Sequence, residues 1–319
     1  MKIKKILIAI VLLGTLCAGY FVYLYLTKQS IPFFSRQTTG AYYSAGVLTT
    51  NKPFSLDLDN ISLLDRKASG IKEKLLIADP FLFNNDGNFY MFFEIMGKTG
   101  ADIGVAKVTE NNNLEYLGVV LDESKHLSYP LVFKDGEHIY MIPESQALNA
   151  VKLYEAVDFP LKWKFKKDII AKSRLADPTV FKKDGVWFMF AEAAKELRLF
   201  YADSLLGNWT EHPKSPVKKG NYTRPAGRMF SHNGKLIRFG QDSYGGYGRQ
   251  VYGFTIDSLN KSDYKETALK NNPVVSANGE GWAKNGMHHI DIQKKEDGTF
   301  IVALDGRGYG KERIIFSLN

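Results

Sequence analysis

Residues 78–94 read ADPFLFNNDGNFYMFFE and contain two apolar runs separated by Asn-Asn-Asp-Gly. An Asp-Gly pair between two such runs is a strong hairpin signal, because both residues tolerate the backbone angles of a tight turn. The stretch therefore predicts two antiparallel strands. Asp79 and Pro80 lie in the first strand, and Glu94 ends the second.

The same pattern returns along the chain at a step of close to fifty residues. In the first three copies, the residue before the proline and the closing glutamate are fifteen positions apart. These pairs are Asp79 and Glu94, Tyr129 and Glu144, and Asp177 and Glu192. A weaker copy starts at Arg224 and Pro225, and a fifth starts at His288 and His289. Strand-rich units at such a period are typical of a propeller, so we predict an all-β, five-bladed β-propeller.

Two further strand-like runs precede the first copy, at residues 42–50 and 54–58. A propeller has to close its ring, and pairing an N-terminal strand into the last blade is the usual solution. We therefore expect one of these two runs to complete the blade built from residues 288–318.

Length and composition fit a single large β domain. The chain has 319 residues, and its one cysteine, Cys17, rules out an internal disulfide. The formal net charge of +8 is spread along the chain, with Lys2, Lys4 and Lys5 supplying three of the charges. No basic and aromatic constellation points to nucleic acid, so we expect no nucleic-acid partner.

The N-terminus predicts a membrane anchor. Residues 6–26 carry no charge, and as a helix they would be about 31 Å long, enough to cross a bilayer core. The three preceding lysines place the N-terminus in the cytoplasm and the rest outside. A cleaved signal peptide is the competing interpretation. The expected organisation is a cytoplasmic tail at 1–5, a transmembrane signal anchor at 6–26, an irregular stalk at 27–40 and the propeller at 41–319.

The first strand of each propeller blade lines the central axis, so equivalent residues of different blades converge on one funnel. Two carboxylates around such a pocket are what glycosidic bond chemistry needs, one as base or nucleophile and one as proton donor. We predict catalytic roles for Asp79, as base or nucleophile, and for Asp177 or Glu192, as proton donor.

The remaining candidates are predicted to contact the substrate, with Arg224 suited to an anionic group. They are Tyr129, Arg224, His288, His289, Trp282, Glu94 and Glu144. Some of these residues also have a purely structural alternative. The repeated glutamates could form hydrogen bonds to a neighbouring blade, and Trp282 could pack in a loop. We expect no cofactor and no metal, because no two further ligands stand out beside the histidine pair.

Several ordered motifs resemble the N-terminal domain of glucosamine inositolphosphorylceramide transferases. They are YSAGV at 43–47, KPF at 52–54, IADPF at 77–81, SYP at 128–130, DP at 177–178, RPAG at 224–227 and HHID at 288–291. The resemblance runs from about residue 41 to the C-terminus. The glycosyltransferase domain that follows in those proteins has no counterpart in these residues, so that activity is not carried over.

The Asp-Pro hairpins also resemble the five-bladed propellers of glycoside hydrolase family 43. That resemblance implies an Asp base on the first blade, an Asp on the second that tunes its pKa, and a Glu proton donor on the third. Asp79 matches the first position, whereas Tyr129 and Asp177 occupy the other two. The family triad is therefore not intact.

The leading hypothesis is a membrane-anchored, outward-facing, carbohydrate-active protein with glycoside hydrolase or glycosyl-transfer chemistry in the funnel. Its partner would be a glycan or glycoconjugate, with an anionic one among the alternatives. A non-catalytic glycan-binding module is the first alternative, and a propeller that scaffolds a protein partner is the second.

Overall fold

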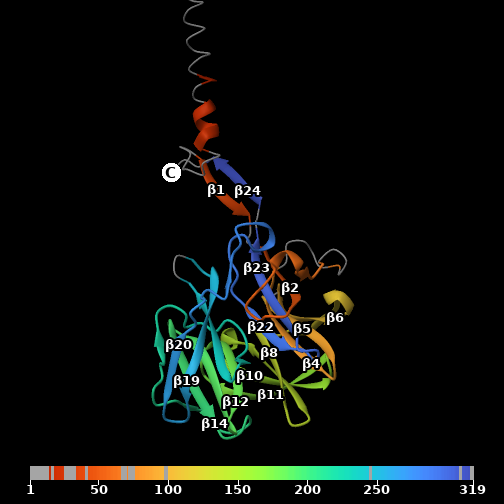
Figure 1. Cartoon of the computed structure of the whole chain (residues 1–319), viewed down its shortest axis with the longest axis vertical. Helices are drawn as coiled ribbons and strands as arrows, with labels where there is room; N and C mark the ends of the chain where they lie inside the picture. Colours follow the sequence, from red (N-terminus) through yellow and green to blue (C-terminus); the bar gives the residue numbers. More distant parts are fainter. Residues whose placement is uncertain are drawn as a thin grey trace, which may run out of the picture. The chain divides into compact units, whose positions relative to one another are not determined.

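The computed structural model describes residues 14–15, 18–24, 34–39, 42–65, 70, 76–96, 100–243, 246–308 and 311–316. It divides into two compact units (Figure 1). The larger unit is Tyr42–Gly308, and the smaller combines Met1–Ala41 with Tyr309–Asn319. The last residues of the chain therefore group with the first, and not with the blade expected to contain them.

In the smaller unit, residues 18–24 are helical, and strands β1 (Phe34–Thr39) and β24 (Lys311–Phe316) pair antiparallel. The irregular stalk expected at 27–40 thus contains a strand, because its partner comes from the far end of the chain. Most of the predicted anchor and the whole tail at 1–5 lie outside the described residues. Within the described ranges, no helix combines the length and the apolar character needed to span a membrane.

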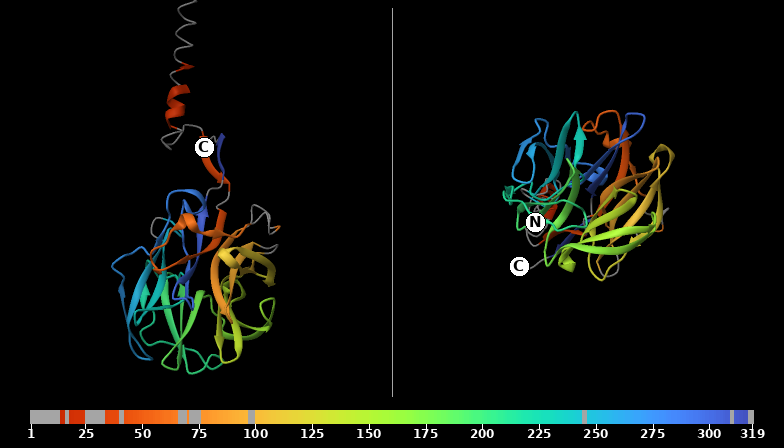
Figure 2. Two further views of the ribbon diagram at one scale, coloured as in Figure 1. Left: turned by 45° about the vertical axis from the view of Figure 1, so that its right-hand side comes forward. Right: turned by 90° about the horizontal axis from the view of Figure 1, so that it is seen from below.

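The larger unit is the predicted five-bladed propeller, with its sheets arranged around a central axis (Figure 2). Blade I contains β4 (Ile77–Asn85), β5 (Asn88–Met96), β6 (Ala101–Val108) and β7 (Leu114–Leu121). Blade II contains β8 (Ser128–Asp135), β9 (His138–Glu144), β10 (Ala150–Asp158) and β11 (Lys162–Ala171). Blade III contains β12 (Ala176–Lys183), β13 (Val186–Ala193), β14 (Glu196–Ala202), β15 (Thr210–Glu211) and β16 (Lys218–Lys219).

Blade IV is built on the weaker sequence copy and starts with a strand of three residues. It contains β17 (Phe230–His232), β18 (Lys235–Asp242), β19 (Gln250–Leu259), β20 (Tyr264–Ala268) and β21 (Val275–Ser276). Short 3-10 helices η1 (Leu58–Asn60), η2 (Glu110–Asn112), η3 (Gln146–Leu148) and η4 (Gly281–Ala283) occur in the connections.

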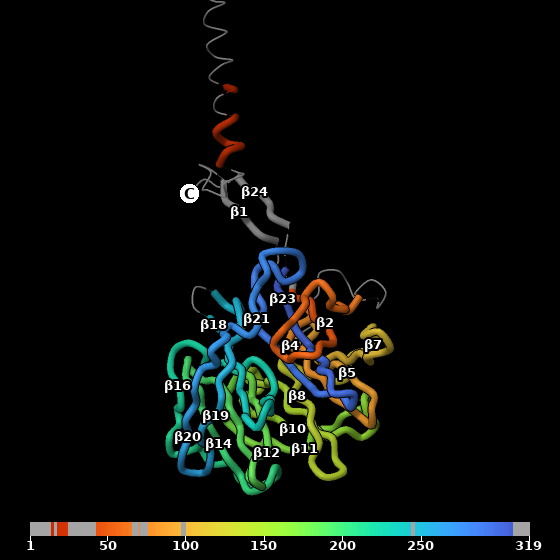
Figure 3. Tube along the Cα trace, in the orientation of Figure 1, coloured from red at the N-terminus to blue at the C-terminus, as the bar shows by residue number. Residues whose placement is uncertain are grey.

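Blade V closes the ring with strands from both ends of the unit. It contains β22 (Ile290–Lys294), β23 (Phe300–Gly308), β2 (Tyr42–Thr50) and β3 (Ser62–Leu63), in that order. β2 pairs with β23 along its whole length, and Figure 3 shows these two strands side by side. The ring-closure prediction is confirmed for residues 42–50. The run at 54–58 is not a strand; it leads through a turn into η1.

Each of the five apolar clusters found among the described residues fills the space between two neighbouring blades. Leu131 of blade II packs in one cluster with Met189 of blade III, for example, and Val47 of blade V packs in another with Ile77 of blade I. The central strands are therefore covered on both faces. This explains why they read as continuous apolar runs rather than alternating ones.

The guanidinium of Arg228 links residues of four blades at the axis. Arg228, just before β17, forms an ion pair with Asp291 of β22 at 3.0 Å. The same guanidinium donates to the carbonyl of Leu82 in β4 at 2.8 Å and to that of Val132 in β8 at 3.0 Å. Asp291 in turn accepts a bond of 2.7 Å from the backbone N–H of Leu82. All three guanidinium nitrogens thus have partners within the fold.

We predict that Arg228→Met lowers the free energy of unfolding by about 3–5 kcal/mol, because it leaves the fully buried Asp291 carboxylate without its cation. Urea denaturation followed by circular dichroism measures the change. Lys162→Met is the control, since Lys162 and Asp158 form an exposed pair and its loss should cost about 0–0.5 kcal/mol. A loss below about 1 kcal/mol in Arg228→Met would contradict the role we assign to this residue.

Candidate functional site

The residue before the proline has the same unusual backbone in each of the first three blades. Asp79, Tyr129 and Asp177 have φ angles of 50°, 48° and 51°, in the left-handed region. A residue before proline ordinarily prefers extended angles, so each position is strained by about 1–2 kcal/mol. The pairing of the two inner strands is interrupted at the same place in all three blades. These interruptions turn the three side chains toward the axis.

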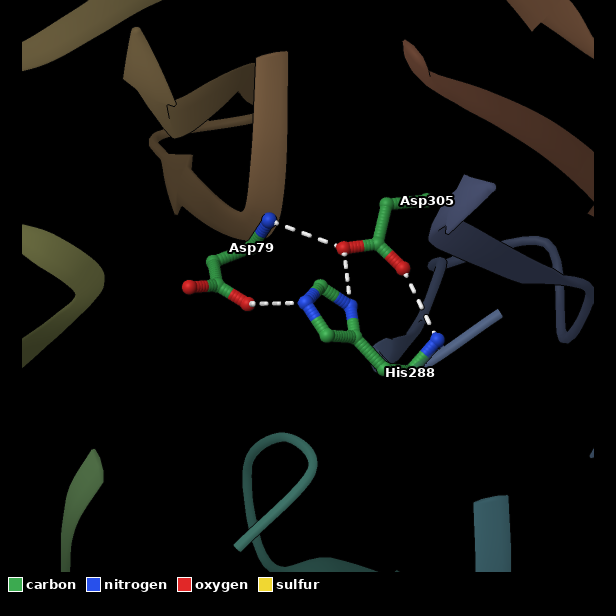
Figure 4. Close-up of side chains that lie close together, drawn as sticks. All are labelled: Asp79, His288 and Asp305. Atoms are coloured by element: carbon green, nitrogen blue, oxygen red, sulfur yellow. Dashed lines mark hydrogen bonds and ion pairs between the residues drawn. The ribbon is translucent and has the colours of Figure 1, made fainter. Parts of the chain in front are cut away.

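Asp305, in β23, lies at the centre of the site (Figure 4). One carboxylate oxygen accepts the backbone N–H groups of His288 and His289, each at 3.1 Å. The other accepts the backbone N–H of Asp79 at 3.0 Å and lies 2.6 Å from Nδ1 of His288. Burial opposes ionisation of Asp305, but the charge and hydrogen bond of His288 outweigh burial, so the pKa of this carboxyl lies below its ordinary value.

The imidazole of His288 lies between Asp305 and Asp79. Its Nε2 is 3.9 Å from Oδ1 of Asp79, and its ring stacks on Tyr43 with centroids 4.7 Å apart. Burial opposes the imidazolium charge, yet Asp305 raises the pKa of His288 above its ordinary value.

Asp79 is only 4% exposed, and its Oδ1 has no hydrogen-bond partner among the described residues. Burial raises the pKa of Asp79 to about 7, with the charge of His288 opposing the shift and that of Asp177 adding to it. Asp79 therefore carries a proton over much of the range in which an ordinary aspartate is ionised.

Two of the predicted binding residues pack inside the propeller. Tyr129 is fully buried, and its hydroxyl contacts Thr179 at 2.8 Å and the backbone N–H of Gly227 at 2.8 Å. His289 is buried with its ring against Phe81 and Tyr129, and burial lowers its pKa to about 3. Of the histidine pair, His288 contacts Asp305 and lies 3.9 Å from Asp79, whereas His289 packs as a neutral ring with its Nδ1 3.7 Å from Oδ1 of Asp79.

Asp177 and Arg224 form a two-pronged ion pair. Nε and Nη2 of Arg224 donate to the two carboxylate oxygens of Asp177 at 2.6 and 3.1 Å. Gln241 donates through Nε2 to the same carboxylate at 3.1 Å and to the carbonyl of Pro225 at 3.1 Å. Both Nε2 protons of Gln241 are thus used, which fixes the orientation of its amide.

An open cavity of about 430 Å³ adjoins this pair. Its lining consists of Glu192, Lys195, Gly220, Asn221, Tyr222, Thr223, Arg224, Gln241, Ser243 and Tyr247. Tyr247 lies with its ring 5.4 Å from the Arg224 guanidinium and 5.3 Å from the His288 ring. Asp79, His288 and Asp305 are absent from the lining of this cavity.

The three repeated glutamates occupy matching positions, opposite Ala78, Ser128 and Ala176. Only Glu192 lines the cavity, and it accepts the backbone N–H of Lys195. Glu94 is buried and lies 3.4 Å from Nε2 of His126. Burial, then the charges of Asp79 and Glu144, raise the pKa of Glu94 well above its ordinary value.

Glu144 is likewise buried, and it accepts bonds from Ser128 at 3.2 Å and from the backbone N–H of Gln146 at 2.8 Å. Burial, and next the charge of Asp177, raise the pKa of Glu144 to about 7. These bonds stay within its own blade, whereas the purely structural alternative expected from the sequence was a bond to a neighbouring blade.

Trp282 lies in η4 and covers Gly306, where an added Cβ would come within 2.5 Å of the indole ring. It packs against the apolar cluster between blades IV and V and is absent from the lining of the cavity beside Arg224. The structure therefore supports the packing interpretation of Trp282.

The ligand atoms of Asp79, His288 and Asp305 lie within 4.8 Å of one another, so these residues could hold a cation. Both oxygens of Asp305 and Nδ1 of His288 are already engaged with one another or with backbone N–H groups. Within this trio, the atoms left to bind a cation are therefore on Asp79 and on the edge of the His288 ring that faces it.

Three residues of the site were not predicted: Asp305, Gln241 and Tyr247. Asp305 and Gln241 lie in the second strands of blades V and IV, near positions where the other blades carry glutamate, so the repeat contained a usable signal for both. Tyr247 lies in the connection after β18 and has no equivalent in other blades.

We predict that Glu144→Gln changes how stability depends on pH. The folded state keeps a proton on Glu144 up to about pH 7, whereas the unfolded chain releases it near pH 4.5. Unfolding therefore releases a proton between these values, and raising the pH favours unfolding. From pH 4.5 to 7.5 the wild type should lose stability relative to the variant by on the order of 2–3 kcal/mol. Urea denaturation at both pH values measures this, and a pH-independent difference would refute it.

Comparison with known proteins identifies relatives for most of the chain. Residues 65–307 match the family described as "Glucosamine inositolphosphorylceramide transferase 1, N-terminal". The protein of that name from Oryza sativa subsp. japonica is 38% identical over 246 residues, covering 72% of this chain and 33% of the relative. The protein from Arabidopsis thaliana is 36% identical over 253 residues, covering 75% and 33%.

Solved structures share the fold at low sequence identity. A thermostable family-43 glycoside hydrolase has a TM-score of 0.56 at 13% identity, over 77% of this chain and 95% of that one. The α-L-arabinofuranosidase PaAbf62A from Podospora anserina, solved with cellotriose, has a TM-score of 0.54 at 12% identity, over 72% and 90%. The chain spans about a third of the length of its plant relatives. On the family match, the chain belongs to the glucosamine inositolphosphorylceramide transferase 1 N-terminal domain family.

Proposed function

We propose that the cavity beside Arg224 binds a glycan or glycoconjugate through its hydroxyl groups. One observation carries the proposal: two residues that line the cavity, Gln241 and Arg224, each have an unused hydrogen-bonding atom. Oε1 of Gln241 is buried with no hydrogen-bond partner, and Nη1 of Arg224 has none among the described residues. A sugar hydroxyl can donate to the first and accept from the second.

Turning over the amide of Gln241 would not give its oxygen a hydrogen-bond donor within the protein. Turning the side chain over would present oxygen to Asp177 and to the Pro225 carbonyl, both of which are acceptors. A buried acceptor without a partner costs about 1–3 kcal/mol, and a bound hydroxyl removes that cost.

The rest of the lining suits a sugar ring. Tyr247 is 45% exposed and offers an aromatic surface, while Asn221, Thr223 and Lys195 add polar groups around it. An apolar surface with a few placed polar groups is the usual construction of a small-molecule site. The plant relatives are named for a sugar and a ceramide-based lipid, which supports a glycoconjugate as the partner.

Glycosidic bond chemistry is the second candidate, and Asp79 is the observation that favours it. A carboxyl group with a raised pKa beside an ionised one is the arrangement of a proton donor and its partner. Burial raises the pKa of Asp79 to about 7, whereas Asp177 forms a two-pronged ion pair with Arg224. The roles expected from the sequence are thus reversed: Asp79 becomes the proton donor, and Asp177 the base or nucleophile. Glu192 remains a candidate at the cavity edge.

The membrane anchor is also part of the proposal. Residues 6–26 would cross the bilayer, with the N-terminus in the cytoplasm and the propeller on the extracytoplasmic side. The uncharged run and its preceding lysines support this. Tyr20, Phe21, Val22 and Tyr23 are large and exposed in the described part of the helix, as lipid-facing residues would be.

A glycan panel tests binding and turnover together, with the full chain in detergent micelles. We expect the wild type to bind at least one surface glycan, and Gln241→Met to weaken that binding about three- to tenfold through one lost hydrogen bond. Saturation-transfer NMR measures binding, and mass spectrometry detects released sugars. Lys162→Met, remote from the cavity, is the control and should bind like the wild type.

Product formed by the wild type and lost in a folded Asp79→Asn variant would establish the enzyme. Binding without product would establish the binding module instead. No binding to any glycan, or equal binding by Gln241→Met, would refute the site.

We predict that the full chain stays with the membrane fraction after alkaline extraction, whereas a chain beginning at residue 27 is released. Accessibility of the propeller to protease from the outer side only would confirm the orientation. Release of the intact full chain by alkali would refute the anchor, and recovery of the mature protein without residues 1–26 would favour the signal peptide.

A further inference from the structure

A second hollow lies between blades IV and V, at the end of the strands that is remote from the cavity beside Arg224. Two cavities of about 390 and 360 Å³ share Phe54 and His232 in their linings, so they form one groove, here called the blade IV–V groove. Lys235 lines this groove and begins β18, whereas Gln241 lines the cavity beside Arg224 near the other end of the same strand. At about 3.3 Å per residue, Lys235 and Gln241 lie about 20 Å apart.

The turn after β2 supplies one wall of the groove. The hydroxyl oxygen of Thr50 accepts the backbone N–H of Lys52 at 3.2 Å and lies 3.1 Å from the carbonyl oxygen of Ser55. The backbone N–H of Ser55 in turn donates to the carbonyl of Lys52 at 3.0 Å. These bonds fix the turn that carries Lys52 and Phe54, two residues of the KPF motif, which has no part in the cavity beside Arg224.

Aromatic contacts hold the two shared rings in place. Phe54 meets the rings of Phe230 and Phe239 edge-on, with centroids 5.9 and 6.3 Å apart. His232 stacks on Phe230 with centroids 5.7 Å apart and meets Phe54 edge-on at 6.1 Å. Phe54 and His232 are only half-buried, so each keeps an accessible surface in the groove.

The loop after β20 supplies another wall. Asn272 exchanges two hydrogen bonds with the backbone of Gly253, accepting at 2.7 Å and donating at 2.9 Å. The backbone N–H of Leu269 also donates to the carbonyl of Gly253, at 2.9 Å. The loop that presents Leu269 and Lys270 is therefore tied to β19, and the groove is formed before a ligand binds.

The buried part of the lining is apolar. Ile237 and Val274 are the buried residues of the first cavity, and Pro53 and Phe300 are those of the second. No residue of either lining has a buried side-chain polar atom without a hydrogen-bond partner, whereas the cavity beside Arg224 has one. A ligand rich in hydroxyl groups therefore suits that cavity, and an apolar side chain suits the groove.

Three lysines surround this apolar interior. Lys52, Lys235 and Lys270 are exposed and come from three separate segments of the chain. Neither lining contains an aspartate or a glutamate, and none of the three lysines forms an ion pair with a described residue. An apolar interior with a polar rim is typical of an interaction site. Because the rim is cationic here, the complementary partner is acidic.

We propose that the blade IV–V groove docks a segment of a partner protein in which acidic residues flank an apolar side chain. The apolar side chain enters the groove beside Phe54, and the acidic residues face the lysines. A cavity accepts a side chain that projects from the partner, whereas binding to a lipid surface uses apolar side chains that project from the protein. The groove therefore favours a peptide over an anionic membrane. This site is separate from the proposed glycan site and does not depend on it.

Selection from random peptides of about twelve residues, displayed on phage, tests the proposal with the full chain in detergent micelles. We expect the selected peptides to combine a net negative charge with a Phe, Leu, Ile or Trp residue. Synthetic copies are then titrated against the protein by fluorescence anisotropy. Raising the salt concentration from about 0.05 to 0.5 M should weaken binding about tenfold, because salt screens the exposed lysines.

Variants assign the binding to the groove. The double variant with Lys52→Met and Lys235→Met keeps the long side chains but removes two charges, and it should weaken binding about tenfold. Phe54→Ala removes part of the apolar wall and should weaken binding about tenfold, with circular dichroism verifying the fold. Lys162→Met, on blade II, and Gln241→Met, in the proposed glycan site, should bind the peptides like the wild type.

The outcomes decide the two sites separately. Recovery of no binding peptide, or only of neutral or basic ones, overturns the docking site, and so does equal binding of acidic peptides by the wild type and the lysine double variant. Lysine-dependent binding of phosphatidylcholine vesicles with about 30% phosphatidylserine, without peptide binding, assigns the groove to a membrane and also overturns it. None of these results affects the glycan site, and a failure to bind glycans leaves the peptide result unchanged.

Discussion

The Asp305 carboxylate is the constraint on which both the ring and the site depend. It lies on β23, the second strand of blade V, which closes the ring. It accepts the backbone N–H of Asp79 on blade I. The same group receives the backbone N–H groups of both histidines and the His288 ring. The pairing of β2 with β23 closes the ring and positions β23 so that Asp305 can make these contacts. A buried carboxylate with four donors is satisfied without an arginine, so the cluster is ordered by its own hydrogen bonds.

The backbone strain in the inner strands also contributes to the arrangement of the site. Asp79, Tyr129 and Asp177 share a left-handed backbone before proline, but only the two aspartates present carboxyl groups to the site. Tyr129 uses the identical geometry to reach across the axis to Gly227. The strained backbone is therefore a feature of the blade, and what varies is the side chain placed on it. Strain of this kind persists because the surrounding packing holds it.

The repeat made most of the fold predictable, because each hairpin carries its own turn and apolar pattern. Features that depend on distant partners were not predictable locally. The strand at Phe34–Thr39 exists through pairing with Lys311–Phe316, and Trp282 packs because Gly306 leaves room for it. The site residues likewise differed in whether the local sequence could predict them. Residues before the prolines could be named from position, whereas Tyr247 lies in an irregular connection whose course is set by the finished ring.

The two buried arginine–aspartate pairs show which part of the axis serves architecture. Arg228 uses all three nitrogens on Asp291 and on backbone carbonyls, so nothing is left for a ligand. Arg224 spends two nitrogens on Asp177, keeps a third without a partner in the described structure, and is 30% exposed at a cavity wall. A buried ion pair gives little net stability compared with apolar packing. Because the Arg228 pair already joins the blades at the axis, the partly exposed Arg224 pair is the one that fits the ligand site we propose.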